Sequence, residues 1–188
     1  MHDSQSMRTA RLNLMPTTLA HLDAGLASPA ALGQLLRVTV PASWPPGAYD
    51  RAAVEFFRKQ LLAHPDAIGW FGWYAIRRST PSEPAVLIGA AGYLGPPDPL
   101  GCVEVGYSIV PEFRAAGFAT ELLHALAARA LRTPGVVRVI ARTTPGNPAS
   151  IKVLEHCGFK PAEADSEAGM LTYELPGACA IGAQPADR

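Results

Sequence analysis

Apolar and polar positions change their period within one stretch of the chain, residues 101–131. From Val103 to Val110 they alternate, which is the pattern of a β-strand with two different faces. From Phe118 to Leu131 apolar residues recur every three or four positions, as on the buried side of an α-helix. Pro111 ends the strand because proline has no N–H for the ladder. The stretch therefore predicts a strand, a tight loop and a helix. One face of the strand would carry Val103, Val105, Tyr107 and Ile109, and the other Glu104, Gly106, Ser108 and Val110.

The amino-terminal third predicts three helices and one irregular loop. Leucines at helical spacing indicate a helix pair over 17–28 and 29–36, because Thr17-Thr18 and Ser28-Pro29 are helix start signals. A third helix is expected over 50–63. Residues 41–50 hold three prolines and a glycine, so they cannot form regular structure.

Six further segments are predicted to be strands, since they alternate or are rich in β-branched and aromatic residues. In the first of them Arg11 and Asn13 would lie on the solvent face. The second and third would form a hairpin, and the fourth is a continuous apolar run typical of an inner strand. The segments are 8–14, 68–77, 85–94, 136–142, 159–162 and 170–175.

A short helix is expected after the 136–142 strand. Asn147 is a good N-cap, Pro148 suits the first helical position, and Gly158 suits the residue after the last turn. Together the elements predict one α+β domain, an α/β sandwich whose central sheet is mixed, mostly antiparallel and six- to seven-stranded, with flanking helices. We expect a flexible terminus over 1–7, the domain over 8–175 and a disordered tail over 176–188.

Composition narrows the class of protein. The chain has 188 residues, which suits a single domain, and its 16 basic and 16 acidic residues balance. Binding to nucleic acid or to an anionic membrane would need clustered basic residues, so we expect neither. Three cysteines are too few and too scattered for a disulfide framework or a metal site. Without an apolar run of signal-peptide length, the expected location is cytoplasmic.

The loop between the strand and the helix, residues 114–119, suits one chemical task. Its small side chains let a ligand approach the backbone, and the first N–H groups of a helix carry partial positive charge. These properties indicate a diphosphate site, although close packing alone would also explain small residues here. The Walker and dinucleotide-binding motifs are absent from the sequence.

Two motifs in order resemble the GNAT superfamily of N-acetyltransferases, which bind acetyl-CoA. The first is Arg-x-x-Gly-x-Ala from Arg114, and the second is Asn-x-x-Ser-x-x-x-Leu-Glu-x-x-Gly-Phe from Asn147. Two further segments look most like the branch that includes ribosomal-protein N-terminal acetyltransferases. They are the tetrapeptide Glu104-Val-Gly-Tyr107 and a first strand of the type Thr9-Ala-Arg11-Leu-Asn-Leu14. The resemblance covers residues 8–175 and implies splayed central parallel strands.

The resemblance implies a set of residues that bind acetyl-CoA as a co-substrate. Amides of the loop would hold the diphosphate, with Arg114 adding charge, and the pantetheine would run along an exposed backbone at the end of the strand. Arg114 could instead be a surface arginine, and capping alone would explain Asn147. The set is Ile109, Val110, Arg114, Ala115, Ala116, Gly117, Phe118, Ala119, Thr120 and Asn147.

Two residues are candidates for proton transfer. Glu104 would act as the base or orient a water, unless it is an edge carboxylate paired with an arginine. Many family members carry a tyrosine as proton donor just before the glutamate of the short helix, where this chain has Leu154. Ser150, one turn earlier, could bond the leaving thiolate, although serine there is also a capping residue. Glu121 is expected in the first turn of the central helix because of its dipole.

The acceptor is expected to be an amine, and its type decides how strong a base is needed. An α-amine titrates near 8 and a lysine near 10.4, so the lysine costs about 3.4 kcal/mol more to deprotonate at pH 7. We therefore favour a protein or peptide N-terminus, with Trp44 and Tyr107 as substrate-binding residues; Trp44 could instead only pack its loop. A small-molecule amine and a non-catalytic acyl-CoA-binding module stay open as alternatives, as does a homodimer.

Overall fold

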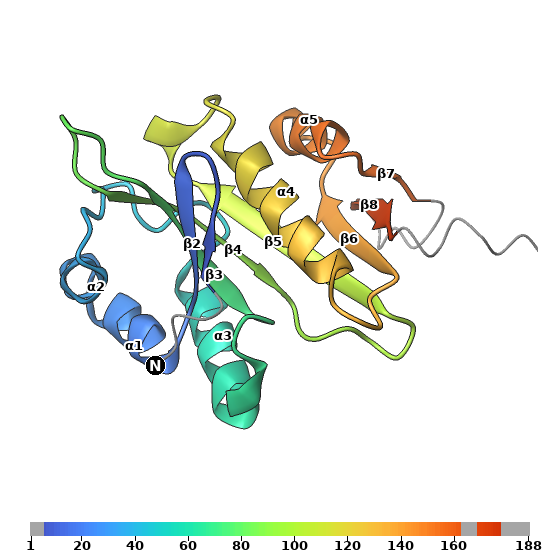
Figure 1. The fold of residues 1–188 in the computed structure, drawn as a ribbon, viewed down its shortest axis with the longest axis horizontal. Coiled ribbons are helices and arrows are strands. Elements are labelled where there is room, and N and C mark those ends of the chain that lie inside the picture. Colours follow the sequence, from blue (N-terminus) through green and yellow to red (C-terminus); the bar gives the residue numbers. More distant parts are fainter. Residues whose placement is uncertain (1–5, 163–168, 178–188) are drawn as a thin grey trace, which may run out of the picture.

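The described residues, 6–162 and 169–177 of a computed structural model, form a mixed eight-stranded sheet with helices on both faces (Figure 1). The order in the sheet is β1-β2-β3-β4-β5-β6-β8-β7. The strands are β1 (Met7–Arg8), β2 (Leu12–Pro16), β3 (Gly72–Arg77), β4 (Val86–Tyr93), β5 (Cys102–Ile109), β6 (Arg138–Thr143), β7 (Lys160–Pro161) and β8 (Leu171–Pro176). The helices are α1 (Leu19–Ala27), α2 (Pro29–Leu36), α3 (Arg51–Ala63), α4 (Phe118–Leu131) and α5 (Pro148–His156).

The predicted α+β sandwich is confirmed, and so are the helices and their start signals. The side chains of Thr18, Ser28, Asp50 and Asn147 each accept a hydrogen bond from an amide in the first turn of the helix that follows. Each cap satisfies one of the N–H groups that a helix start leaves without a partner. Local polar residues therefore fix where four of the helices begin.

The strand count differs from the six to seven predicted. The segment 8–14 is a hairpin and not one strand, since β1 and β2 pair antiparallel across a turn at 9–11. The amide of Thr9 donates to the carbonyl of Leu12, and the hydroxyl of Thr9 accepts from the amide of Leu12. Arg11 lies in that turn instead of on the solvent face of a strand, while Asn13 is exposed in β2 as expected.

The central parallel pair is splayed, as the resemblance implied. β5 and β6 pair over three residues, from Cys102 with Arg138 to Glu104 with Ile140. Beyond Glu104, β5 continues paired to β4 up to Ile109, whereas β6 continues paired to β8 up to Thr143. The two strands therefore diverge toward their carboxyl ends, where the loop before α4 and the start of α5 lie (Figure 1).

Side chains of β4 show which helix covers which face of the sheet. Tyr93 donates its hydroxyl to the carbonyl of Leu126 in α4 at 2.7 Å. The neighbouring Gly92 faces the other way, since a Cβ there would lie 3.1 Å from the ring of Phe57 in α3. Because successive strand residues alternate between faces, α4 and α3 cover opposite faces. Both faces are apolar, and every residue of β4 is buried.

The carboxyl-terminal prediction is only partly open to comparison. β7 and β8 correspond to the two short strands expected there, and β8 ends at Pro176. The polar turn expected at 163–169 lies mostly outside the described residues, as do residues 1–5 and the tail from 178 onward.

Candidate functional site

The loop before α4 presents main-chain amides without partners. Gly117, the N-cap, has a left-handed φ of 78° and no side chain that could cap the helix. Within the described part of the chain, no amide from Ala115 to Thr120 donates a hydrogen bond; Glu121 is the first, to the carbonyl of Gly117. A row of free amides at a helix N-terminus is the arrangement that binds phosphate groups.

Residues at the end of β5 differ from the expectation of an exposed backbone. Ile109 and Val110 are buried, at 5% and 0% exposure. The amide of Val110 donates to the carbonyl of Ile88, and the guanidinium of Arg114 donates from Nε to the carbonyl of Ile109 at 2.9 Å. Arg114 thus covers this main chain instead of projecting freely. Contact of these residues with a ligand stays a prediction.

Tyr107 of β5 and Ser150 of α5 are in hydrogen-bonding contact. The hydroxyl of Tyr107 in β5 lies 3.0 Å from Oγ of Ser150 in α5 and 3.3 Å from its carbonyl oxygen. Burial raises the pKa of Tyr107 to about 12, partly offset by the bond to Ser150. At neutral pH the phenol therefore keeps its proton. Both residues were expected in the site from the sequence, but the bond between them was not predicted.

The residue at the usual tyrosine position takes no part in this polar pair. Leu154 is fully buried and belongs to the hydrophobic core. Asn147 caps α5 through a bond from the amide of Ser150 at 3.1 Å, so the capping explanation holds for Asn147. The same cap fixes the main chain of Ser150 in the first turn of α5.

Glu104 lies on the opposite face of β5 from Tyr107, at the point where the parallel pairing ends. Its carboxylate is 3.6 Å from Nη1 of Arg142 in β6, and its side chain is 23% exposed. Glu104 is therefore paired with an arginine, which was the alternative to a catalytic role for this residue. Further along the same face, a Cβ on Gly106 would meet no atom within 4 Å. Open space thus lies beside Glu104.

The 41–50 loop covers the end of that face. Trp44 is 8% exposed and packs edge-on against Tyr74 at 5.7 Å between ring centroids, so its packing role is observed. A Cβ on Gly47 would lie 2.8 Å from Oγ of Ser108 in β5. Ser43 donates to the carboxylate of Glu112, in the turn that follows β5. The loop therefore borders the open space over Gly106, and contact of Trp44 with substrate stays a prediction.

Sequence reasoning missed two arginines next to the predicted site. Arg142 approaches Glu104 from the neighbouring strand, and Arg11 contacts both Ala116 and Glu121 from the β1–β2 turn. Glu121 lies in the first turn of α4, as expected. Both arginines belong to segments distant in sequence from their partners. Charge pairing over such distances leaves no local signal.

Two absences apply to the described ranges, 6–162 and 169–177. No helix there is both long and apolar enough to cross a membrane. No group of three or more His, Cys, Asp or Glu side chains there could hold a metal ion. Cys102 and Cys157 are buried free thiols.

A family model and a relative of known sequence both identify N-acetyltransferases as similar to this chain. Residues 11–160 match the family model of the acetyltransferase (GNAT) domain. An uncharacterized N-acetyltransferase of Bacillus subtilis, YjdG, is 28% identical over 153 residues, which cover 81% of this chain and 88% of the relative.

Solved structures share the fold at low identity. A ribosomal-protein-S5-alanine acetyltransferase from Vibrio fischeri superposes with a TM-score of 0.63 at 16% identity, over 92% of this chain and 97% of its own. The ribosomal L7/L12 α-N-protein acetyltransferase RimL, solved with coenzyme A, gives 0.62 at 15% identity, over 92% and 98%. With the family model spanning most of the chain, this protein belongs to the GNAT acetyltransferase family and is an acetyl-CoA-dependent N-acetyltransferase.

Proposed function

We propose that the acceptor is the α-amine of a protein or peptide N-terminus, and that it attacks acetyl-CoA directly through the opening between β5 and β6. The observation that carries this proposal is the division of β5 into two chemically different faces. Glu104 and the space over Gly106 lie on one face, and the Tyr107–Ser150 pair lies on the other. A base on one side and an acid on the other suit a transfer between two substrates.

Acetyl-CoA would supply the acetyl group as a thioester. The free amides of residues 115–120 fit its diphosphate, because they are aligned with the positive end of the α4 dipole. Gly117 fits this role since its left-handed φ favours glycine and its missing side chain leaves the amides accessible. Loop and helix would thus hold the nucleotide end and direct the thioester toward the opening.

On the acceptor face, Glu104 would accept the proton that the amine loses, directly or through a water. The nitrogen forms a bond to the acetyl carbon, and the carbon–sulfur bond breaks. Glu104 forms an ion pair with Arg142 at 3.6 Å and is partly exposed, and an ionised carboxylate is a weak base. A weak base is sufficient for an α-amine, which titrates near 8, and much less so for a lysine near 10.4.

On the other face, Ser150 would give a proton to the leaving thiolate and would regain one from water after the thiol has left. For this the serine hydroxyl must donate outward, which requires Tyr107 to donate to the serine oxygen. The 3.0 Å separation allows either hydroxyl to be the donor, and the raised pKa of Tyr107 keeps its proton in place. Tyr107 is therefore proposed as the hydrogen-bond partner of Ser150. Together they would take over the proton donation that a tyrosine at position 154 provides in many family members.

The relatives support the choice of a protein acceptor. Two structural neighbours are named as acetyltransferases of a ribosomal protein, S5 in one case and L7/L12 in the other. Identities of 15–16% relate their folds to this chain and leave its acceptor to experiment. A small-molecule amine remains the alternative within the same chemistry.

The test of the cofactor site is Gly117→Glu, with acetyl-CoA binding measured by calorimetry. A carboxylate at the loop would oppose the diphosphate, and we expect at least a tenfold loss of affinity, about 1.4 kcal/mol. Gly135→Glu is the matched control, because Gly135 also has a positive φ, 87°, and lies beyond the far end of α4. Equal affinity in both variants would exclude the loop as the site.

The acceptor is tested by following thiol release from acetyl-CoA with peptides and with small amines. We expect turnover with peptides that carry a free α-amine, and none when that amine is blocked. Turnover confined to small amines would overturn the choice of acceptor. Tight coenzyme A binding without thiol release for any amine would instead indicate a non-catalytic acyl-CoA-binding module.

A further inference from the structure

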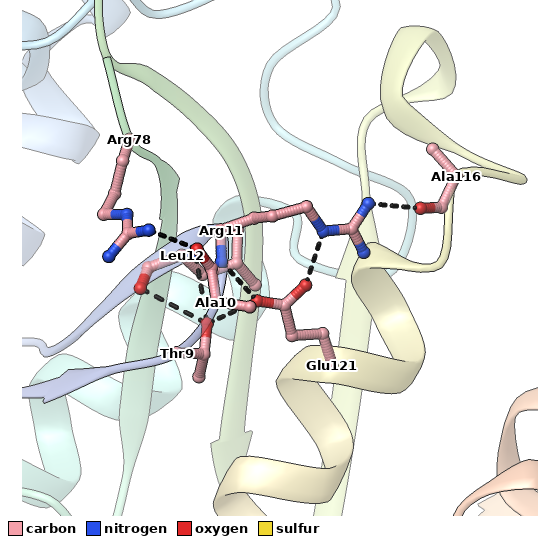
Figure 2. A network of polar contacts seen from close by, with 7 residues as sticks. All are labelled: Thr9, Ala10, Arg11, Leu12, Arg78, Ala116 and Glu121. Atoms are coloured by element: carbon pink, nitrogen blue, oxygen red, sulfur yellow. Dashed lines mark hydrogen bonds and ion pairs between the residues drawn. The ribbon is translucent and has the colours of Figure 1, made fainter. Parts of the chain in front are cut away.

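The turn between β1 and β2 is fastened to the first turn of α4 by an arginine–glutamate pair (Figure 2). Nε of Arg11 lies 2.7 Å from Oε2 of Glu121, and the amide of Arg11 donates to Oε1 of Glu121 at 2.7 Å. The hydroxyl of Thr9 donates to the same Oε1 at 2.5 Å. On the other side of the turn, Arg78 donates to the carbonyl of Ala10. The turn and the helix start therefore form one rigid unit.

Glu121 is held ionised within this unit. Partial burial acts to raise its pKa, but the hydrogen bonds from Thr9 and Arg11 and the charge of Arg11 outweigh burial and lower it. An ionised carboxylate and a guanidinium form strong, short, directional bonds. Glu121 therefore fixes the direction in which the guanidinium of Arg11 extends.

The far edge of that guanidinium contacts the loop. Nη1 of Arg11 donates to the carbonyl of Ala116 at 2.8 Å, as Figure 2 shows. The guanidinium carbon also lies 4.2 Å from the ring centroid of Phe118, the first residue of α4. A Cβ on Gly117 would lie 3.3 Å from Nη2. One side chain thus touches three successive residues of the loop.

The bond to Ala116 determines where the next amide points. A peptide unit is planar and trans, so its carbonyl and its N–H point in opposite directions. With the carbonyl of Ala116 held on Arg11, the N–H of Gly117 points in the direction opposite to this bond. A charged donor on the carbonyl also polarises the peptide and increases the positive charge on that N–H.

The loop needs such support because one of its residues, Ala115, has an unfavourable conformation, whereas glycine adopts the φ of Gly117 readily. Ala115 has φ of 56° and Gly117 has φ of 78°, both in the left-handed region. A residue with a Cβ, such as Ala115, adopts that region only when its surroundings impose it. In the described residues the carbonyl of Ala116 has Arg11 as its hydrogen-bond donor.

We infer that Arg11 is a positioning residue for coenzyme A: it orients the Gly117 amide toward the diphosphate without touching the ligand's reacting atoms. The inference rests on the proposed phosphate role of the loop. It extends the cofactor site to a residue more than one hundred positions away, in a different element. Arginine suits this role because different nitrogens of its planar fork donate to Glu121 and to Ala116 in a fixed geometry, whereas a lysine has one flexible ammonium group.

The test is the calorimetric affinity for coenzyme A of Arg11→Met, Arg11→Lys and a control, Arg58→Met. Arg58 is also an arginine in an ion pair, with Asp23 on α1; it lies in α3, and its side chain is 41% exposed. We expect about tenfold weaker binding for Arg11→Met, an intermediate loss for Arg11→Lys, and no loss for Arg58→Met. Affinity is read from the binding-competent fraction, so partial misfolding of a variant does not imitate the effect.

A second readout separates positioning from general loosening. In the free protein, the amide NMR signal of Gly117 should move in Arg11→Met, while the amides of β3 and β4 stay in place. Unchanged affinity, or a loss of affinity with an unmoved Gly117 signal, would overturn the role of Arg11. If the unmodified protein fails to bind coenzyme A, the proposed function is wrong, and that result is distinct from a failure of the Arg11 variants.

Discussion

Leu154 has no hydroxyl, so in the proposed mechanism another residue must supply the proton for the leaving thiolate. Leu154 is fully buried, so it contributes packing where many relatives offer a hydroxyl. The hydroxyls that remain near the opening come from Ser150, one turn earlier in α5, and from Tyr107 in β5. In the proposed mechanism, proton donation would thus be shared between two elements instead of residing in one helix.

Ser150→Ala and Tyr107→Phe are expected to slow the chemical step. Loss of a general acid lowers the rate by about a hundredfold or more, and loss of its partner should cost less. Single-turnover acetyl transfer measures the step, and calorimetry should give unchanged affinity for coenzyme A. Ser150→Thr, which retains a hydroxyl, is the control. Wild-type rates in both Ser150→Ala and Tyr107→Phe would remove the pair from the mechanism.

His21 links folding stability to pH. Its Nδ1 accepts a bond from the amide of Thr18 in a capping box, and burial lowers its pKa from about 6.5. The folded state therefore binds its proton less readily than the unfolded chain. Stability is unaffected above about pH 6.5 and falls as the pH decreases below it.

His21→Gln should remove part of this acid sensitivity, because glutamine keeps the capping-box acceptor but does not titrate. Urea unfolding between about pH 5 and pH 8 measures it. The control is His124→Gln, on the exposed side of α4. An identical pH profile for the His21 variant and the unmodified protein would contradict this role for His21.

At the scale of elements, the glycines of β4 explain how closely it packs against β5. A Cβ on Gly89 would lie 2.7 Å from the main-chain oxygen of Ser108 and 2.5 Å from Cδ1 of Ile109. A main-chain neighbour cannot move away without disturbing the ladder. The strand pair that supports the loop before α4 therefore depends on a missing methyl group.

Gly89→Ala should destabilise the fold by about 1–3 kcal/mol, the usual cost of overpacking. The matched variant is Gly106→Ala in β5, where an added Cβ meets no atom within 4 Å. That change should alter the free energy of unfolding by less than about 0.5 kcal/mol. Chemical denaturation measures the free energy of unfolding of both variants. Equal values would show that β4 and β5 can accommodate an added Cβ at position 89.

The elements themselves were largely predictable from the sequence, and the exceptions have a physical cause. Caps such as Thr18 and Asn147 act over three residues, so their signal is local. The β1–β2 hairpin was missed because β1 is two residues long and gives no periodic pattern. Its turn is stabilised by Glu121, more than one hundred positions away, and no local window contains both partners.

At the scale of the whole molecule, the motifs predicted the loop before α4 but not the side-chain pairs that lie near it. Gly117 and its free amides follow from a short pattern that a sequence displays directly. The pairing of Glu104 with Arg142 and of Tyr107 with Ser150 depends on how far β5 and β6 diverge. That divergence is a property of the assembled sheet, in which β6 turns toward β8.

The three-residue ladder between β5 and β6 has a consequence for the width of the passage. In the described residues these two strands are hydrogen-bonded to each other at one end only, and the Tyr107–Ser150 bond joins β5 to α5, the helix that follows β6. The two hydroxyls thus link β5 to the segment that follows β6. In the proposed mechanism, this link would therefore also influence the distance between the amine and the thioester.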